Sequence, residues 1–115
     1  MPWETRRRSS AYVPMRKRSA YVCGGVYWGK KQAFHNLCKE LSSSVITDEQ
    51  NGIRAKHNDE SHLNKWKSKY GATLATPAWA FASNYRNLRD ITPIIEVVHK
   101  PLNFERQPSN QTSTI

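Results

Sequence analysis

One stretch of this sequence, residues 57–64 (His-Asn-Asp-Glu-Ser-His-Leu-Asn), limits most strongly how the chain can fold. It contains two carboxylates, two imidazoles, two amides and a hydroxyl, with Leu63 as its one apolar residue. Burying so many polar groups costs free energy unless each finds a partner, so the stretch is either a solvated helix start or a functional site. A helix cap at Asn58 or Asp59 would account for the acidic residues. It would not account for the accompanying histidines and asparagines.

Hydrophobic periodicity predicts two helices. Between residues 30 and 41, apolar residues recur on one face at helical spacing, and Gly29 precedes them. A second helix is expected over about residues 59–69, with Leu63 and Trp66 facing inwards and Gly71 just beyond its end.

Short β-prone runs occupy residues 20–23, 26–28 and 94–98, with a weaker one at 73–75. Thr47-Asp48-Glu49-Gln50 has the spacing of a capping box, which would begin a further short element. Strands and helices therefore alternate along the chain. This order predicts an α/β fold with a mixed sheet and flanking helices, and the thin sheet suggests part of a larger fold.

Length and charge narrow the possibilities further. With 115 residues the chain is one small domain or a piece of a larger one. It contains no apolar run long enough for a membrane-spanning helix. Lys and Arg number 18 against 9 Asp and Glu, with basic clusters at residues 6–8 and 16–18. A net charge of +9 fits either a solubilising surface or attraction to polyanions.

The cysteines and histidines predict no metal site. Cys23 and Cys38 are too few for a disulfide framework, and no Cys-x-x-Cys pair is present. A zinc enzyme built on His57, Asp59 and His62 is disfavoured, because histidines five residues apart project from different faces of a helix.

Three ordered segments resemble glycosyltransferase family 6, which contains the ABO blood-group transferases, the α-1,3-galactosyltransferase, Forssman synthase and bacterial and phage relatives. Residues 51–65 resemble the family's C-terminal catalytic motif, most specifically at Asp-Glu-Ser-His-Leu-Asn. Residues 3–14 resemble its Tyr-Glu-Arg-Arg-Pro and Ala-Tyr-Ile-Pro segments, and residues 21–29 are similar to its Gly-Gly-x-x-x-Gly donor-site strand and turn. The resemblance covers about residues 3–100.

The resemblance implies a hexosyltransferase that retains anomeric configuration. The donor would be UDP-galactose or UDP-N-acetylgalactosamine, and the sugar would be joined α-1,3 to a β-galactoside-type glycan acceptor. Residues 1–100 would form the C-terminal part of the catalytic domain, as the C-terminal half of a GT-A nucleotide-diphospho-sugar transferase fold. Residues 101–115, rich in Asn, Gln, Ser and Thr, would be a disordered tail.

The resemblance also assigns roles to individual residues. Glu60 matches the family's candidate nucleophile or oxocarbenium stabiliser, and it would also contact the acceptor. Asp59 matches the acid that hydrogen-bonds the donor sugar, and Asn58 stands where many members have His. The other implied donor contacts are Cys23, Gly24, Gly25 and Lys100, and the other implied acceptor contacts are Trp3 and Trp79.

Some positions depart from the family pattern. The small Gly25 leaves room at the sugar 2-position, which favours N-acetylgalactosamine slightly. His57 stands where the family has Trp, and Pro101 follows Lys100 in place of the family's sequence. Ala82 replaces an acidic acceptor contact, so the fucose-bearing acceptors of the ABO enzymes need not apply.

The family's metal-binding Asp-x-Asp, or Asn-x-Asn in many bacterial members, does not occur in this sequence. Mn²⁺ held through the donor diphosphate in full-length members would need those ligands. We therefore expect the 115-residue chain to be incomplete, without full affinity for the donor and without turnover on its own.

An alternative function is a small basic nucleic-acid-binding module without enzymatic activity. It rests on the charge of +9 and on aromatic residues near arginines, but neither a recognition helix nor an RNA-binding signature accompanies them. The sequence does not determine localisation. A Golgi membrane is expected for an animal member, and the cytoplasm or membrane periphery for a bacterial one.

Overall fold

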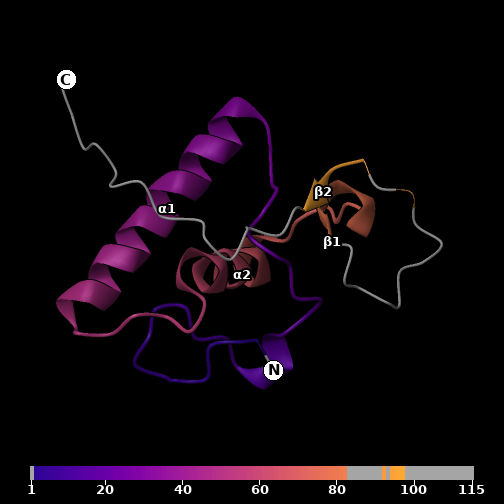
Figure 1. Cartoon of the computed structure of the whole chain (residues 1–115). Coiled ribbons are helices and arrows are strands. Elements are labelled where there is room, and N and C mark those ends of the chain that lie inside the picture. The colour runs from indigo at the N-terminus through magenta and orange to yellow at the C-terminus, as the bar shows by residue number, and fades with distance from the viewer. Residues whose placement is uncertain (1, 83–91, 93, 98–115) are drawn as a thin grey trace, which may run out of the picture. The chain divides into compact units, whose positions relative to one another are not determined.

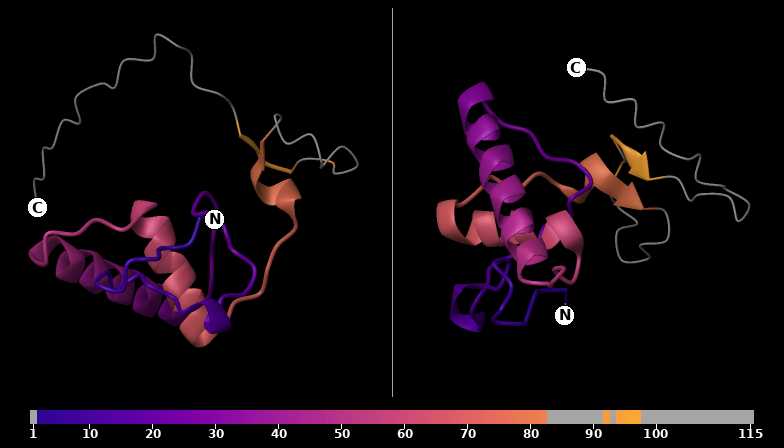
Figure 2. Two further views of the ribbon diagram at one scale, coloured as in Figure 1. Left: turned by 90° about the horizontal axis from the view of Figure 1, so that it is seen from below. Right: turned by 90° about the vertical axis from the view of Figure 1, so that its left-hand side faces the viewer.

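The computed structural model describes residues 2–82, 92 and 94–97, and the chain divides into two compact units, Met1–Ala75 and Thr76–Ile115. In the first unit a short 3₁₀ helix, η1 (Met15–Lys17), precedes two α-helices, α1 (Lys31–Gln50) and α2 (Asn58–Tyr70). The two long helices cross (Figure 1). Residues 2–30, which precede α1 and which we call the N-terminal segment, lie beside α2 (Figures 1 and 2). This segment and α2 contain most of the predicted site residues.

Helix α1 is longer than its apolar pattern predicts, because the serines at 42–44 do not end it. The Thr47 hydroxyl donates to the carbonyl of Ser43, 2.9 Å away, a bond that lets a polar residue remain inside a helix. The predicted capping box is therefore wrong, since Thr47 lies in the last turns of α1. The helix ends before Gly52, whose φ of +67° is one that glycine adopts without strain.

Helix α2 confirms the helix expected over about residues 59–69. Its N-cap residue, however, is His57 and neither Asn58 nor Asp59. His57 occupies the N-cap position without a side-chain cap bond, and its backbone N–H donates instead to the Ser61 hydroxyl at 3.0 Å. Asp59 and Glu60 lie in the first turn, where the helix dipole favours negative charge. Gly71, with φ of +80°, follows the last turn as predicted.

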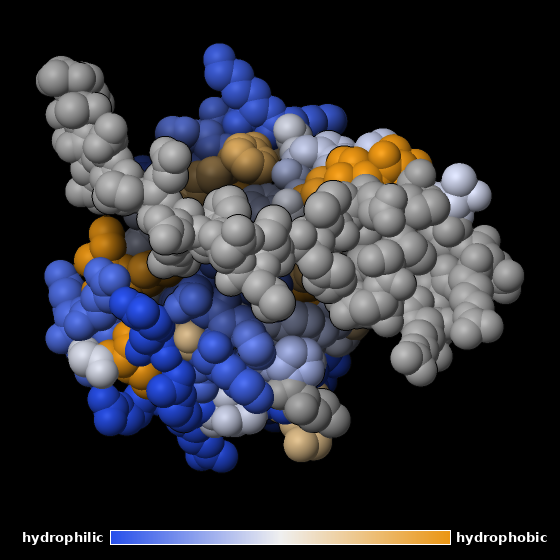
Figure 3. Space-filling view, viewed as in Figure 1, coloured by the Kyte–Doolittle hydropathy of each residue, from blue (hydrophilic) through white to orange (hydrophobic). Residues whose placement is uncertain are grey.

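The interior of the first unit is as polar as it is apolar. Among its described residues, seven apolar ones are buried: Trp3, Ala11, Val13, Leu37, Ile53, Ala55 and Leu63. Seven polar ones are also buried: Glu4, Ser9, Asp48, Ser61, His62, Asn64 and Lys67. The outer surface in the view of Figure 3 is mostly hydrophilic where residues are described. Hydrogen bonding between buried groups must therefore contribute much of the specificity of this fold.

In the second unit, the 3₁₀ helix η2 (Pro77–Ala80) leads into β1 (Phe81–Ala82), which pairs in parallel with β2 (Glu96–Val97). The register aligns Phe81 with Glu96. The Ala78 carbonyl accepts backbone N–H groups from Ile94 and Ile95 at 2.7 and 3.0 Å.

The predicted mixed sheet with flanking helices is wrong for the part of the chain that the structure describes. The first unit is helical, and the pairing of β1 with β2 spans two residues per strand. Residues 20–23, 26–28 and 73–75 are irregular. Of the expected strand at 94–98, the structure describes residues 94–97, and Glu96–Val97 of these form a strand. The physical reason at residues 20–24 is that side chains of α2 bond the backbone groups that a neighbouring strand would otherwise bond. None of the described helices is long and apolar enough to cross a lipid bilayer.

Candidate functional site

The carboxylate of Glu60, in the first turn of α2, is held by two donors from the N-terminal segment. The Tyr21 hydroxyl donates to Oε1 and the Gly24 backbone N–H donates to Oε2, each at 2.8 Å. A Cβ at position 24 would lie 3.4 Å from the Glu60 Cβ, so the two residues are in van der Waals contact range. The fold therefore brings together two predicted site residues that are 36 positions apart.

Two further polar side chains of α2 continue this contact along the helix. Asn64 accepts from the Val22 N–H at 2.9 Å and donates to the Val22 carbonyl at 2.8 Å, as an adjacent β-strand would. Lys67 donates to the Ser19 hydroxyl at 2.7 Å and to the Ala20 carbonyl at 2.6 Å. Glu60, Asn64 and Lys67 are spaced four and three residues apart, so they share one face of α2. We call these three residues the ladder.

An aromatic cluster supports the donor hydroxyl. The ring of Tyr21 meets the buried Trp3 edge-on, with centroids 5.2 Å apart, and the Arg18 guanidinium lies 5.8 Å from the Trp3 ring centroid. Burial, and secondarily the bond to Glu60, raises the pKa of Tyr21. The phenol therefore stays protonated at neutral pH and remains a hydrogen-bond donor to the carboxylate.

A pocket of about 380 Å³ lies on another side of the start of α2. Asn58, Asp59 and His62 contribute to its lining from α2, and Asp48 contributes from α1. Asn58 has φ of +48°, in the left-handed region that Asn tolerates better than most residues. The first turn thus directs Asp59 and Glu60 to different environments: Asp59 lines the pocket and Glu60 contacts Gly24.

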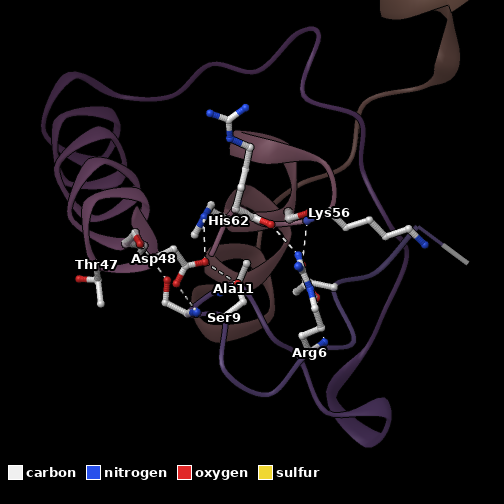
Figure 4. A network of polar contacts seen from close by, with 12 residues as sticks. Arg6, Ser9, Ala11, Thr47, Asp48, Lys56 and His62 are labelled. Carbon is white, nitrogen blue, oxygen red and sulfur yellow. Dashed lines mark hydrogen bonds and ion pairs between the residues drawn. The ribbon is translucent and has the colours of Figure 1, made fainter. Parts of the chain in front are cut away.

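Asp48 links α1 to the N-terminal segment beside this pocket. Its carboxylate accepts the Ser9 hydroxyl at 2.5 Å and the Ser10 N–H at 2.7 Å, and Figure 4 shows it between Ser9 and His62. Burial alone would raise the pKa of Asp48, but the bonds from Ser9 and Ser10 outweigh it and lower the pKa. Asp48 is therefore ionised at neutral pH.

His62 is buried beside Asp48 but is not strongly bonded to it. Its Nε2 lies 3.7 Å from Asp48 Oδ2, too far for a hydrogen bond, and its Nδ1 has no hydrogen-bond partner among the described residues. Burial lowers the pKa of His62 despite the attraction of Asp48. The imidazole is therefore neutral near pH 7, and the pair is not a strong ion pair.

A second buried carboxylate, Glu4, joins the N-terminal segment to the loop before α2. It accepts the Arg6 side chain at 2.8 and 3.0 Å, the Arg6 N–H at 2.8 Å and the Lys56 N–H at 2.8 Å. The side chain of Arg6 also donates to the Arg54 carbonyl. The hydrogen bond from Arg6 is the main reason that the pKa of Glu4 falls to about 2.

The other predicted site residues lie in different surroundings. Cys23 and Gly25 flank Gly24 and are exposed, and nothing lies within 4 Å of a Cβ built at Gly25. Trp3 is buried against Tyr21. Trp79 belongs to η2 in the second unit and is partly exposed. Lys100 and the predicted tail 101–115 fall outside the described residues.

Mn²⁺ does not fit the described residues. No group of three or more His, Cys, Asp or Glu side chains among them is placed to hold a metal ion. We therefore assign no step of the chemistry to a metal held by this part of the chain.

Sequence reasoning did not single out Tyr21, Asp48 or Glu4 as parts of this arrangement. A polar stripe was readable in α2, because Glu60, Asn64 and Lys67 follow one another at helical spacing. No local pattern identified the partners, since each bond spans tens of residues.

Comparison with known proteins finds matches that cover most of the chain. The sequence model of glycosyltransferase family 6 matches residues 1–103. Over 64 residues, 56% of this chain, the sequence is 39% identical to histo-blood group ABO system transferase 1 of Rattus norvegicus. Over a segment of the same length it is 34% identical to globoside alpha-1,3-N-acetylgalactosaminyltransferase 1 of Gallus gallus.

A bacterial relative matches a longer segment. The chain is 26% identical over 89 residues, 77% of its length, to the O-antigen biosynthesis glycosyltransferase WbnI of Escherichia coli. The aligned segments cover 18%, 19% and 38% of the rat, chicken and bacterial proteins, so the similarity spans well under half of each relative.

Proposed function

This chain belongs to glycosyltransferase family 6, and from that membership we propose that the start of α2 and the loop at Gly24 form the sugar-transfer face of a retaining hexosyltransferase. The similar proteins are glycosyltransferases, which supports glycosyl transfer as the general activity. The observation that carries the finer proposal is the Glu60 carboxylate, held between the Tyr21 hydroxyl and the Gly24 N–H at the beginning of a helix.

Glu60 has the chemistry that retaining transfer needs. A carboxylate below the anomeric carbon either attacks it, forming a glycosyl–enzyme ester as UDP leaves, or stabilises the positive charge of the oxocarbenium-like transition state. In the first route the acceptor oxygen then displaces the Glu60 carboxylate from the ester, and in the second it replaces UDP on the same face of the sugar as the bond to UDP breaks. In both routes the acceptor proton passes to the diphosphate of the UDP that leaves. Each carboxylate oxygen has two lone pairs, so one hydrogen bond to each leaves acceptor capacity for the substrate.

We propose UDP-N-acetylgalactosamine as the preferred donor over UDP-galactose. The open space around Gly25 supports this choice, because an N-acetyl group at the 2-position needs room that a larger side chain would take. The chicken relative is named as an N-acetylgalactosaminyltransferase, which agrees with it. Asp59, on the exposed rim of the pocket, would bond donor hydroxyls, and a β-galactoside-type glycan would be the acceptor.

Binding to the 115-residue chain tests this proposal. In ¹H–¹⁵N NMR spectra, UDP-N-acetylgalactosamine and a β-galactoside disaccharide should each shift the amide signals of residues 23–25 and 58–61. Glu60→Gln should weaken this binding about tenfold, since a hydrogen bond to a charged group contributes roughly 1.5–3 kcal/mol.

The matched control is Glu40→Gln, which neutralises a partly exposed carboxylate of α1 that pairs with Lys69 at 3.1 Å. It should leave both affinities unchanged. If neither compound shifts the signals of the unsubstituted chain, or if both variants weaken binding equally, the proposed site is wrong.

A further inference from the structure

The amide of Asn64 fixes one stretch of backbone from two sides. It is fully buried, it bonds both the N–H and the carbonyl of Val22, and its Nδ2 also donates to the Glu60 carbonyl at 2.9 Å. One side chain therefore ties the loop before Gly24 to the turn of α2 that carries Glu60. A planar amide whose bonds are all satisfied in a buried place allows little alternative geometry.

Tyr21 acts from the same loop on the other oxygen of the carboxylate. Its hydroxyl bonds Oε1 while the Gly24 N–H bonds Oε2, so Glu60 is held at both oxygens. Trp3 restrains the Tyr21 ring through its edge-on contact. Neither Tyr21 nor Asn64 needs to contact a sugar to produce this arrangement.

We propose that Tyr21 and Asn64 are positioning residues, which hold the Glu60 carboxylate and the Gly24 amide in one fixed arrangement before a sugar binds. This role rests on the function proposed for Glu60. Its value for transfer is that a carboxylate already oriented loses less freedom when the anomeric carbon approaches.

The test uses the Gly24 amide proton as a reporter of the Glu60 carboxylate to which it is bonded. Its NMR signal should shift in Glu60→Gln, where the acceptor is no longer a carboxylate. In Tyr21→Phe, which removes only the hydroxyl, the Gly24 signal should shift in the same direction. Exchange of this amide hydrogen with solvent should become about threefold faster while α1 amides keep their rates, because the carboxylate loses the bond that fixes its other oxygen.

Tyr12→Phe is the matched control, because the Tyr12 hydroxyl makes no hydrogen bond within residues 2–82 while its carbonyl accepts from Lys65. It should reproduce the Gly24 signal and the exchange rate of the unsubstituted chain. The proposal is overturned if folded Tyr21→Phe keeps both the Gly24 signal and the exchange rate of the unsubstituted chain.

Asn64→Asp gives an independent measurement, since it keeps an acceptor for the Val22 N–H and loses both Nδ2 donations. Exchange of the Gly24 amide hydrogen with solvent should become about tenfold faster while α1 amides keep their rates. Unchanged exchange in the folded variant would refute the role of Asn64, and if this variant does not fold, Tyr21→Phe decides. A chain that binds no sugar would contradict the proposed function alone, because the Gly24 measurements need no ligand.

Discussion

Along one side of α2, each polar side chain of the ladder bonds the backbone of residues 19–24, whereas on the other side His62 lies against Asp48 without a hydrogen bond. Buried residues lie on both sides of α2. The ladder contacts the N-terminal segment, and His62 contacts α1. The difference is in hydrogen bonding: Asn64 is satisfied, but Nδ1 of His62 has no hydrogen-bond partner in the described part of the chain. A satisfied buried group is costly to truncate, while an unsatisfied one already carries part of that cost.

The largest expected effect is on the ladder side. Asn64→Leu would leave the N–H and the carbonyl of Val22 without their partner, so we expect a loss of about 3 kcal/mol in the free energy of unfolding. Urea denaturation followed by circular dichroism measures it. Asn36→Leu, on the exposed face of α1, should change the stability by less than about 0.5 kcal/mol. Equal losses in both variants would show that Asn64 contributes no more to the free energy of unfolding than an exposed residue does.

A smaller effect is expected at the link between α1 and the N-terminal segment. Asp48→Asn removes the charge that strengthens the bonds from Ser9 and Ser10, and we expect a loss of about 2 kcal/mol at pH 7. Glu49→Gln, at the next and exposed position, is the control and should have little effect.

The effect of Asp48→Asn on stability should also depend on pH. Because the pKa of Asp48 is lowered in the folded state, its stabilisation is fully present above the ordinary value of 3.8 and is lost as the pH falls below it. The stability difference between Asp48→Asn and the unsubstituted chain should therefore narrow in acid. A difference that stays constant down to pH 2 would contradict the assigned ionisation.

The smallest expected effect concerns His62. Its pKa is lowered by burial, so below the ordinary value of 6.5 the unfolded chain takes up a proton before the folded one does. The unsubstituted chain should lose up to about 1 kcal/mol relative to His62→Gln between pH 7.5 and 5, measured by urea denaturation at each pH. His35→Gln, which changes an exposed histidine of α1, is the control. A relative gain of stability in acid would mean that His62 forms a true ion pair with Asp48.

The net charge of +9 includes basic side chains that bond other groups of the same chain. Arg6 bonds Glu4, Arg8 donates to the Asn51 carbonyl at 3.2 Å, and Arg18 donates to the Val13 carbonyl at 2.9 Å and lies near Trp3. Several basic side chains therefore form hydrogen bonds within the chain. Together with the family match, this favours the transferase over the nucleic-acid-binding alternative.

The sequence by itself determined where the two long helices begin and where polar side chains are concentrated. Periodicity located α2 and the first half of α1, Gly71 marked the end of α2, and residues 57–64 identified its polar start. These features are local, because they depend on residues three or four positions apart. The resemblance of residues 51–65 indicated the family, which the comparison confirmed.

Only the tertiary structure decided the partners. Residues 20–23 look like a strand in sequence, but their neighbour is a row of helix side chains, so the expected mixed sheet did not form there. The bonds of Glu60 to Gly24 and of Asn64 to Val22 join positions 36 and 42 residues apart. Local propensity carries no information about such distant contacts, which are selected by the packing of the folded chain.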